Sequence, residues 1–169
     1  MGIAFEVHPA DVEELTEGPP HEVVAENAYR KAAAIAEHHP AAAALVLGVD
    51  TIVTLGGRIY GKPSGVEEAR ATLRALSGHR HAVLSGVALI GDGRVRTAVS
   101  TTLVDLRPLD DALLEWYLAT GEWDSRAGGY AIQGRGAALV RSIEGDYLNV
   151  VGLPVSTLLE LAPEVLGTR

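Results

Sequence analysis

The sequence predicts an α/β protein with a mixed, twisted sheet flanked by helices, and two patterns carry that prediction. An Ala-rich segment with apolar residues at helical spacing precedes a near-continuous apolar run at residues 42–50, typical of a strand covered on both faces. Residues 81–106 contain two β-runs around "GDG", which indicates a hairpin and makes the sheet mixed rather than purely parallel. With 169 residues, 47% of them hydrophobic, the chain suffices for one core, and we expect a single domain, 1–169.

The first predicted elements are a strand, a helix and a second strand. The alternating stretch "IAFEVHP" is the first strand candidate, and residues 21–39 form the helix. The apolar run at 42–50 then ends at Asp50, which we place at the C-terminal end of its strand. Ligands bind at that edge in open α/β sheets, so the position favours a functional acid; the alternative is an acid that caps a turn.

Three later segments are predicted to be helical. Residues 66–76 carry apolar side chains on one helical face and stop before "SGH". Residues 110–122 form a short helix ended by Gly121, and residues 155–166 form a last helix with Pro154 near its start.

Composition and charge exclude several classes of function. The formal net charge of −8 disfavours binding to a phosphate backbone, so no nucleic-acid partner is expected. Cysteine is absent, which removes disulfides, thiolate nucleophiles and Cys-ligated zinc sites. No apolar segment approaches the ~20 residues of a membrane span, and the first residues lack the basic region of a signal peptide. We therefore expect a cytoplasmic protein with no membrane association.

Three glycine-bearing stretches contain polar residues that no packing argument requires: "GKPSG", "RAGGYAIQGRG" and "EGDYLNVVGLP". Glycine permits left-handed backbone and the close approach of a ligand, which makes these loops candidates for a binding site. Any one of them alone is also explained by turn chemistry.

Six segments, taken together and in order, resemble the Maf family of nucleoside triphosphate pyrophosphatases. They are "DVEE", "GVDTIV", "GKP", "LSGHRHAVLSGVAL", "AGGYAIQG" and "GDYLNVVGLP", and the resemblance runs from about Gly2 to the last helix. It implies a fold of two lobes around a central cleft, similar to inosine triphosphate pyrophosphatases, and a homodimer. It also implies hydrolysis of a nucleoside triphosphate between the α- and β-phosphates with a divalent metal, Mg²⁺ or Mn²⁺. The "AGGYAIQG" loop resembles the branch that acts on dTTP and UTP.

The resemblance assigns the catalytic and metal-binding residues. Asp50 matches the acid of the family's A-D-T motif, which is the proton acceptor or a metal-organising group, although Val49 stands where the family has alanine. Glu14, the final acid of "DVEE", matches an acid near the metal site, and two carboxylates suit the oxygen-ligand preference of Mg²⁺. Lys62 of "GKP" matches a lysine that approaches the phosphates as a compact point charge.

The remaining matches concern the substrate. Lys31, on the first predicted helix, matches a second family lysine, and Lys31 and Lys62 are the two lysines of the chain. Thr51 and Gln133 match positions linked to substrate choice; a glutamine amide can donate and accept at once, as the edge of a uracil or thymine ring requires. His81 also matches a family position, but a lone histidine at the start of a strand is more often a structural hydrogen-bonding residue.

The chain departs from the family in two places. Arg126 stands where lysine is usual, and Ser125 where aspartate often is. Family members also begin with an apolar strand, an S-x-S-P-R-R loop and a helix, whereas this chain starts at "GIAF", so we expect that strand, loop and helix to be missing. Either the natural protein is longer than this chain or the gene product lacks the loop. Since the loop brings a serine and arginines to the triphosphate, this chain is predicted to have little pyrophosphatase activity.

Two alternatives remain at this point. One is a non-catalytic nucleotide-binding or regulatory protein, which the missing loop favours; nucleotide binding without pyrophosphate release would identify it. The other is a pyrophosphatase for purine or deaminated nucleotides such as ITP or XTP, and competition between UTP and ITP separates it from the pyrimidine branch.

Overall fold

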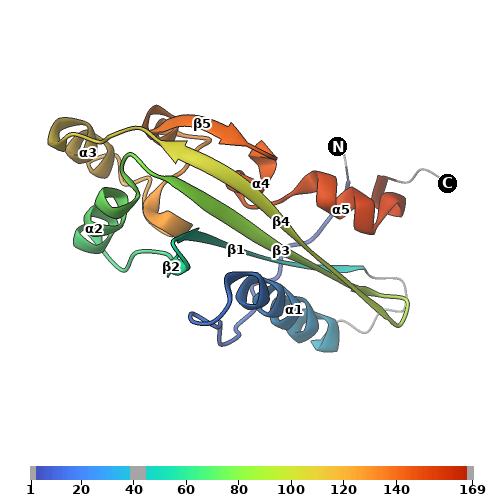
Figure 1. The fold of residues 1–169 in the computed structure, drawn as a ribbon. Helices are drawn as coiled ribbons and strands as arrows, with labels where there is room; N and C mark the ends of the chain where they lie inside the picture. Colours follow the sequence, from blue (N-terminus) through green and yellow to red (C-terminus); the bar gives the residue numbers. More distant parts are fainter. Residues whose placement is uncertain (1–2, 39–44, 167–169) are drawn as a thin grey trace.

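Figure 1 shows the fold in a computed structural model that describes residues 3–38 and 45–166. The helices in these residues are α1 (Pro20–His38), α2 (Val66–Leu76), α3 (Asp111–Leu118), α4 (Tyr147–Val151) and α5 (Val155–Leu161). The strands are β1 (Val46–Leu55), β2 (Arg58–Tyr60), β3 (Arg80–Gly91), β4 (Arg94–Leu106) and β5 (Val140–Glu144). Short 3₁₀ helices are η1 (Ala127–Gly129), η2 (Arg135–Leu139) and η3 (Pro163–Leu166). Across the described ranges, no helix has both the length and the apolarity needed to cross a bilayer.

The strands form one sheet in the order β2-β1-β3-β4-β5, and each described pairing is antiparallel. The predicted α/β class is confirmed, but within the described residues the sheet is antiparallel rather than mixed. The reason is the path of the chain after β1. β2 and α2 lie at the end of the sheet where β1 finishes, so β3 starts there, with Ala82 opposite Thr54, and runs back along β1. A parallel pair would need a crossover to the opposite end.

The strand predicted over residues 3–9 is wrong. Residues 3–16 have no regular secondary structure, and the side chains of Phe5 and Val7 are strongly exposed. Alternation favours a strand only where a neighbouring strand accepts its hydrogen bonds, and none of the described strands pairs with this segment.

The other predicted elements are confirmed, with shifted ends. α1 and α2 fall where helical spacing placed them, and the last predicted helix is split into α5 and η3 at Pro163, which cannot continue an α-helix. The β3–β4 hairpin closes with Asp92 and Gly93 at φ values of 51° and 68°, as a two-residue hairpin turn of the primed kind requires. Residues 39 and 42–44, which the predicted first helix and second strand included, lie outside the described residues.

Helix α1 packs on one face of the sheet, and α4 and α5 pack on the other (Figure 1). The contact with α1 is close because two sheet positions facing it have no side chain. A Cβ at Gly48 would collide with the backbone oxygen of Ala28, and a Cβ at Gly86 would collide with that of Val24. The backbone of α1 therefore lies directly against β1 and β3.

The apolar core has a large part and several smaller parts. The large cluster joins α2, α3 and the nearby ends of the strands and includes Leu73, Leu114 and Tyr117, which are almost fully buried. Smaller clusters lie beneath α5, around Val87 and Leu158, and beneath α1. The largest cluster therefore lies at the α2–α3 end of the sheet, and the smaller ones lie under the helices that cover its two faces.

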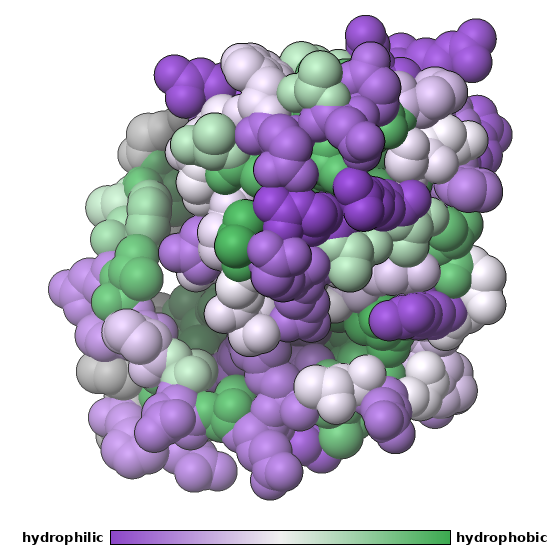
Figure 2. All heavy atoms as spheres, turned by 90° about the vertical axis from the view of Figure 1, so that its left-hand side faces the viewer, coloured by the Kyte–Doolittle hydropathy of each residue, from purple (hydrophilic) through white to green (hydrophobic). Residues whose placement is uncertain are grey.

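The outer surface at the α2–α3 end is tied by ion pairs. Arg70 Nε lies 2.8 Å from Glu115 Oε1, and Arg74 Nη2 lies 3.0 Å from Asp111 Oδ1, so both pairs join α2 to α3. Figure 2, which looks at this end of the molecule, shows hydrophilic side chains gathered over much of its face with apolar ones between them. Exposed pairs of this kind add little stability, and the buried cluster beneath them holds the helices together.

We predict that Gly86→Ala destabilises the protein, because the new Cβ would meet the backbone of α1 rather than a side chain that could move. The expected loss in the free energy of unfolding is about 1–3 kcal/mol, measured by denaturant titration. Gly65→Ala is the control, since a Cβ at Gly65 meets nothing within 4 Å. Equal losses in the two variants would contradict the close α1–sheet contact.

Candidate active site

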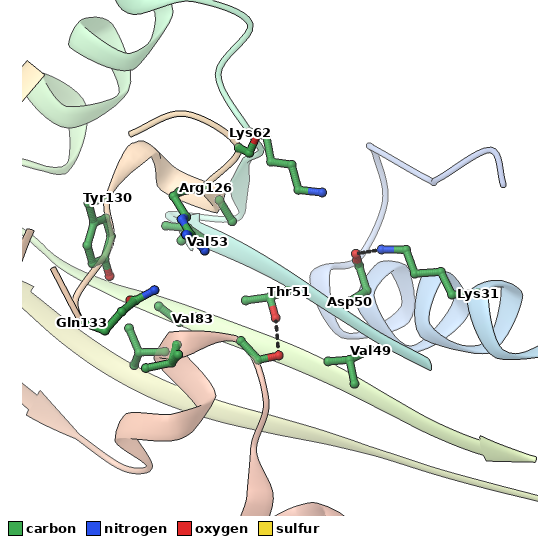
Figure 3. A pocket seen from close by; sticks show the side chains of 15 residues that line it. Lys31, Val49, Asp50, Thr51, Val53, Lys62, Val83, Arg126, Tyr130 and Gln133 are labelled. Atoms are coloured by element: carbon green, nitrogen blue, oxygen red, sulfur yellow. Dashed lines mark hydrogen bonds and ion pairs between the residues drawn. The ribbon is translucent and has the colours of Figure 1, made fainter. Parts of the chain in front are cut away.

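Asp50 lies in the middle of β1, not at the C-terminal end where the sequence analysis placed it. It is opposite Gly86 of β3, and β1 continues to Leu55. The strand continues because the residues after the acid, "TIVTL", are β-branched or apolar and suit a strand. The carboxylate is 6% exposed and points toward α1 (Figure 3). The buried carboxylate is therefore stabilised by partners on α1 and not by a position at the end of a strand.

Lys31 of α1 joins the two predicted metal-binding acids. Its Nζ lies 2.6 Å from Asp50 Oδ1 and 2.8 Å from Glu14 Oε1, so carboxylates from β1 and from the segment before α1 converge on one ammonium. Burial alone would lower the pKa of Lys31, but the hydrogen bonds to Asp50 and Glu14 outweigh it and raise the pKa above its ordinary value. Lys31 is therefore a cation at neutral pH.

A pocket of about 210 Å³ brings together five of the six predicted site residues. It is lined by Lys31, Val49, Asp50, Thr51, Val53, Lys62, Val83, Ser125, Arg126, Ala127, Tyr130, Gln133, Val150, Val151 and Gly152. Glu14 is not among these lining residues and is connected to the pocket through Lys31. Figure 3 shows Asp50 and Lys31 on one side of the pocket and Gln133 and Tyr130 on the other.

Asp50 and Thr51 point to opposite faces of β1. The Thr51 hydroxyl lies 2.8 Å from Ser85 Oγ and donates to the carbonyl oxygen of Gly152 at 3.5 Å, on the side of α4. In the part of the chain that the structure describes, β2 pairs with β1 only from Val53 to Leu55, so the outer edge of β1 has no partner strand beside Asp50 and Thr51. The pocket lies against this edge, so side chains from both faces of the strand line it.

Lys62 and Arg126 are supplied by two loops that are tied to each other. The "GKP" loop follows β2, and the carbonyl oxygen of Gly61 accepts a hydrogen bond from Gly128 N at 3.1 Å. Gly128 has a φ of 69°, and a Cβ there would lie 2.7 Å from Val53 Cγ2, so this position requires glycine. Both basic side chains line the pocket from exposed loop positions.

Gln133 lies on a loop that buried aromatic residues brace. Tyr130 OH lies 2.8 Å from His81 Nε2, with the two rings edge to face, and Tyr117 OH accepts a hydrogen bond from Ala131 N at 3.0 Å. Burial lowers the pKa of His81 to about 4, so the imidazole is neutral at pH 7. His81 thus takes the structural role expected of it.

The residues present fit a divalent cation held with the help of substrate. No group of three or more His, Cys, Asp or Glu side chains comes together as a metal cage within residues 3–38 and 45–166. Glu14 and Asp50 nevertheless converge on one positive charge, the Lys31 ammonium, and both offer the hard oxygen ligands that Mg²⁺ and Mn²⁺ bind. Mg²⁺ commonly uses one or two carboxylates and completes its shell with water and phosphate oxygens.

The sequence analysis did not select two residues that the structure places at the site. Arg126 was noted only as a departure from the family pattern, yet it lines the pocket. Asn27 is 1% exposed and its Nδ2 donates to Asp50 Oδ2 at 3.1 Å. The available signal was spacing: Asn27 falls three residues after Val24 and four before Lys31, which places an amide in the buried stripe of a helix.

We predict that His81 makes the fold less stable in mild acid. The unfolded chain takes up a proton near pH 6.5, whereas folded His81 does so only near pH 4, so acid favours the unfolded state between these values. The expected loss in the free energy of unfolding is about 2 kcal/mol from pH 7 to pH 5. His81→Gln should remove this part of the pH dependence, and His79→Gln, at an exposed position, should retain it. The same pH dependence in wild type and His81→Gln would contradict this account.

Comparison with known proteins agrees with the motifs. Residues 1–165 match the family model described as Maf-like protein. The dTTP/UTP pyrophosphatase of Pyrococcus furiosus is 45% identical over 157 residues, which cover 92% of this chain and 82% of that protein. The dTTP/UTP pyrophosphatase of Gloeobacter violaceus is 45% identical over 166 residues, covering 97% and 86%. That of Halalkalibacterium halodurans is 48% identical over 149 residues, covering 88% and 77%. The resemblance drawn from six short motifs is confirmed, and this chain belongs to the Maf family.

Proposed function

We propose that this chain is a nucleoside triphosphate pyrophosphatase that hydrolyses dTTP and UTP to the monophosphate and pyrophosphate. The observation that carries the proposal is the pocket that joins the Asp50–Lys31–Glu14 cluster to the Gln133 loop. One side supplies charges for a triphosphate and the other supplies an amide for a base. The names of the Maf relatives, dTTP/UTP pyrophosphatases of archaea and bacteria, support this substrate class.

Glu14 and Asp50 would hold the divalent cation, Mg²⁺ or Mn²⁺, where Asp50 lines the pocket and Glu14 lies behind Lys31. When bound, the cation polarises phosphate oxygens and offsets negative charge that develops during hydrolysis. The attacking water gives a proton to Asp50 as its oxygen bonds to the α-phosphorus. The bond from that phosphorus to the oxygen bridging the α- and β-phosphates breaks, and pyrophosphate leaves with the bridging oxygen. Asn27 donates to Asp50 Oδ2 and Lys31 contacts Oδ1, so the orientation of this carboxylate is fixed before substrate binds.

The two lysines bind the polyphosphate. Lys62 lines the pocket from a loop and contributes a compact point charge. The Lys31 ammonium lies between Glu14 and Asp50 in the absence of a cation, and when the cation takes that place we assign N–H donors of Lys31 to a phosphate oxygen. Arg126, which lines the same pocket, adds positive charge between the lysines and Gln133 (Figure 3).

Gln133 and Thr51 select the base. The Gln133 amide presents a donor and an acceptor, the complement of the carbonyl and N–H edge shared by uracil and thymine. The Thr51 hydroxyl faces the same side of β1 as Val53 and Val83, which line an apolar wall of the pocket suited to the flat face of a base. Cytoplasmic location, assembly as a homodimer and lack of a nucleic-acid or membrane partner stay predictions.

Pyrophosphate release tests the function directly. The chain is incubated with UTP, dTTP or ITP, in Mg²⁺, in Mn²⁺ or in chelator, and pyrophosphate and monophosphate are measured together. The proposal requires metal-dependent release of both products from UTP and dTTP in preference to ITP, and a low rate would agree with the little activity that the sequence analysis predicts. Nucleotide binding with no release would identify a non-catalytic binder, and preference for ITP would identify a purine-type enzyme.

We predict that Asp50→Asn lowers kcat for UTP by roughly 10²- to 10⁴-fold, because the amide can neither accept the proton nor bind the cation as a carboxylate does. The matched control is Asp105→Asn, which removes an acid of the same sheet that pairs with Arg80 outside the pocket. Its kcat should stay within about twofold of wild type. An active Asp50→Asn variant would exclude the proposed catalytic role.

We predict that Gln133→Ala lowers kcat/KM for UTP and dTTP by roughly tenfold, since the polar edge of the base loses its partner. The effect on ITP should be smaller, so the UTP/ITP ratio of kcat/KM falls. Arg135→Ala, two positions further on at the exposed start of η2 and outside the pocket lining, is the control. An unchanged ratio in Gln133→Ala would show that another residue selects the base.

A further inference from the structure

Asn27 is a polar residue in the most buried stripe of α1. Its side chain is 1% exposed and sits among Val23, Val24 and Ala28, which are buried by the sheet. A leucine of similar volume would fill this position without the need to place an amide out of water, which costs free energy unless every polar atom is bonded. The role of the amide therefore lies in its hydrogen bonds.

Those hydrogen bonds connect two separate parts of the site. Oδ1 accepts from Leu15 N at 2.7 Å, and Nδ2 donates to Leu15 O at 3.0 Å and to Asp50 Oδ2 at 3.1 Å. The amide cannot be turned over without loss of these bonds, because Leu15 N needs an acceptor while Leu15 O and the carboxylate need a donor. Both hydrogens and the oxygen are used, so a single side chain fixes β1 and the segment before α1 relative to each other.

Glu14 depends on this connection for its position. The segment that carries it has no regular secondary structure, so its backbone has no ladder or helix to hold it. It is held instead by the two Asn27 bonds to Leu15, the next residue, and by Arg30 Nη1, which donates to Glu13 O at 3.0 Å. Of these two side chains, Asn27 is the one that also bonds to Asp50.

The two carboxylates already converge on one positive charge, the Lys31 ammonium. Glu14 Oε1 and Asp50 Oδ1 lie 2.8 Å and 2.6 Å from the same Lys31 nitrogen. Residues that orient metal ligands through hydrogen bonds typically change metal affinity or activity by about 10- to 100-fold when they are replaced.

We propose that Asn27 is the positioning residue that sets the spacing of Glu14 and Asp50 and thereby the affinity of this site for a divalent cation. The inference rests on the proposed function, in which these two acids bind the cation. It assigns to Asn27 no contact with substrate; its effect passes through the two carboxylates.

The test measures Mn²⁺ binding to the nucleotide-free protein by electron paramagnetic resonance, and then the Mn²⁺ concentration that gives half-maximal pyrophosphate release. Asn27→Leu retains volume and Asn27→Ala does not, but both lose the three hydrogen bonds. We expect both variants to bind Mn²⁺ at least tenfold more weakly, with the KM for UTP at saturating Mn²⁺ within about twofold of wild type. Agreement between variants of different size would assign the effect to hydrogen bonding rather than packing.

Ser77→Ala is the matched control. Ser77 Oγ accepts a hydrogen bond from Leu109 N at 2.8 Å outside the pocket, so this variant also loses a link between a side chain and a distant backbone segment. Its Mn²⁺ affinity should equal that of wild type even if its thermal stability falls as far as that of the Asn27 variants.

Two contrary results have different meanings. Wild-type affinity for Mn²⁺ in folded Asn27→Leu or Asn27→Ala would overturn the role of Asn27 and leave the proposed function intact. Failure of the wild-type protein to bind Mn²⁺, with or without UTP, would overturn the metal site itself and the inference with it.

Discussion

The site depends on how closely α1 approaches the sheet. At Gly48 and Gly86 the backbone of the helix occupies the volume where side chains would otherwise stand. This contact brings Asn27 and Lys31 within hydrogen-bonding distance of Asp50, so an acid in the middle of a strand is buried with both oxygens bonded. Without the partners on α1, the same carboxylate would be an unpaired charge in a low-dielectric interior, which proteins avoid.

Lys31 offsets part of the negative charge of Asp50 and Glu14 before a nucleotide binds. Two carboxylates, from β1 and from the segment before α1, share one lysine, which leaves the group with a net negative charge. That excess favours a cation, whereas Lys62 and Arg126 across the pocket favour an anion. A metal–triphosphate complex carries positive charge on the metal and negative charge on the phosphates. The acidic and basic groups of the site are separated in a matching arrangement.

Local patterns predicted the elements well, and tertiary contacts account for what they could not predict. Periodicity located α1, α2 and the β3–β4 hairpin because their apolar spacing is set by the faces they bury. It placed Asp50 at a strand end because an acid in a buried strand is unfavourable unless a partner from another element neutralises it. That partner, Lys31, lies 19 residues away in the chain, so no local pattern could indicate it. The family motifs identified five residues that line the pocket. They missed Asn27 because its hydrogen bonds join two segments that no local sequence pattern relates.

The alternation of β1 has a consequence for how this strand can vary. Asp50 and Thr51 are neighbours in the chain but face opposite sides of the sheet, one toward Asn27 and Lys31 of α1 and one toward α4. Insertion or deletion of one residue before them would exchange the two faces and place the hydroxyl among the charges and the carboxylate beside the apolar wall. Changes of length are therefore tolerated in the turn between β1 and β2 but not within β1, because the register of this strand sets which side chains reach each of its two faces.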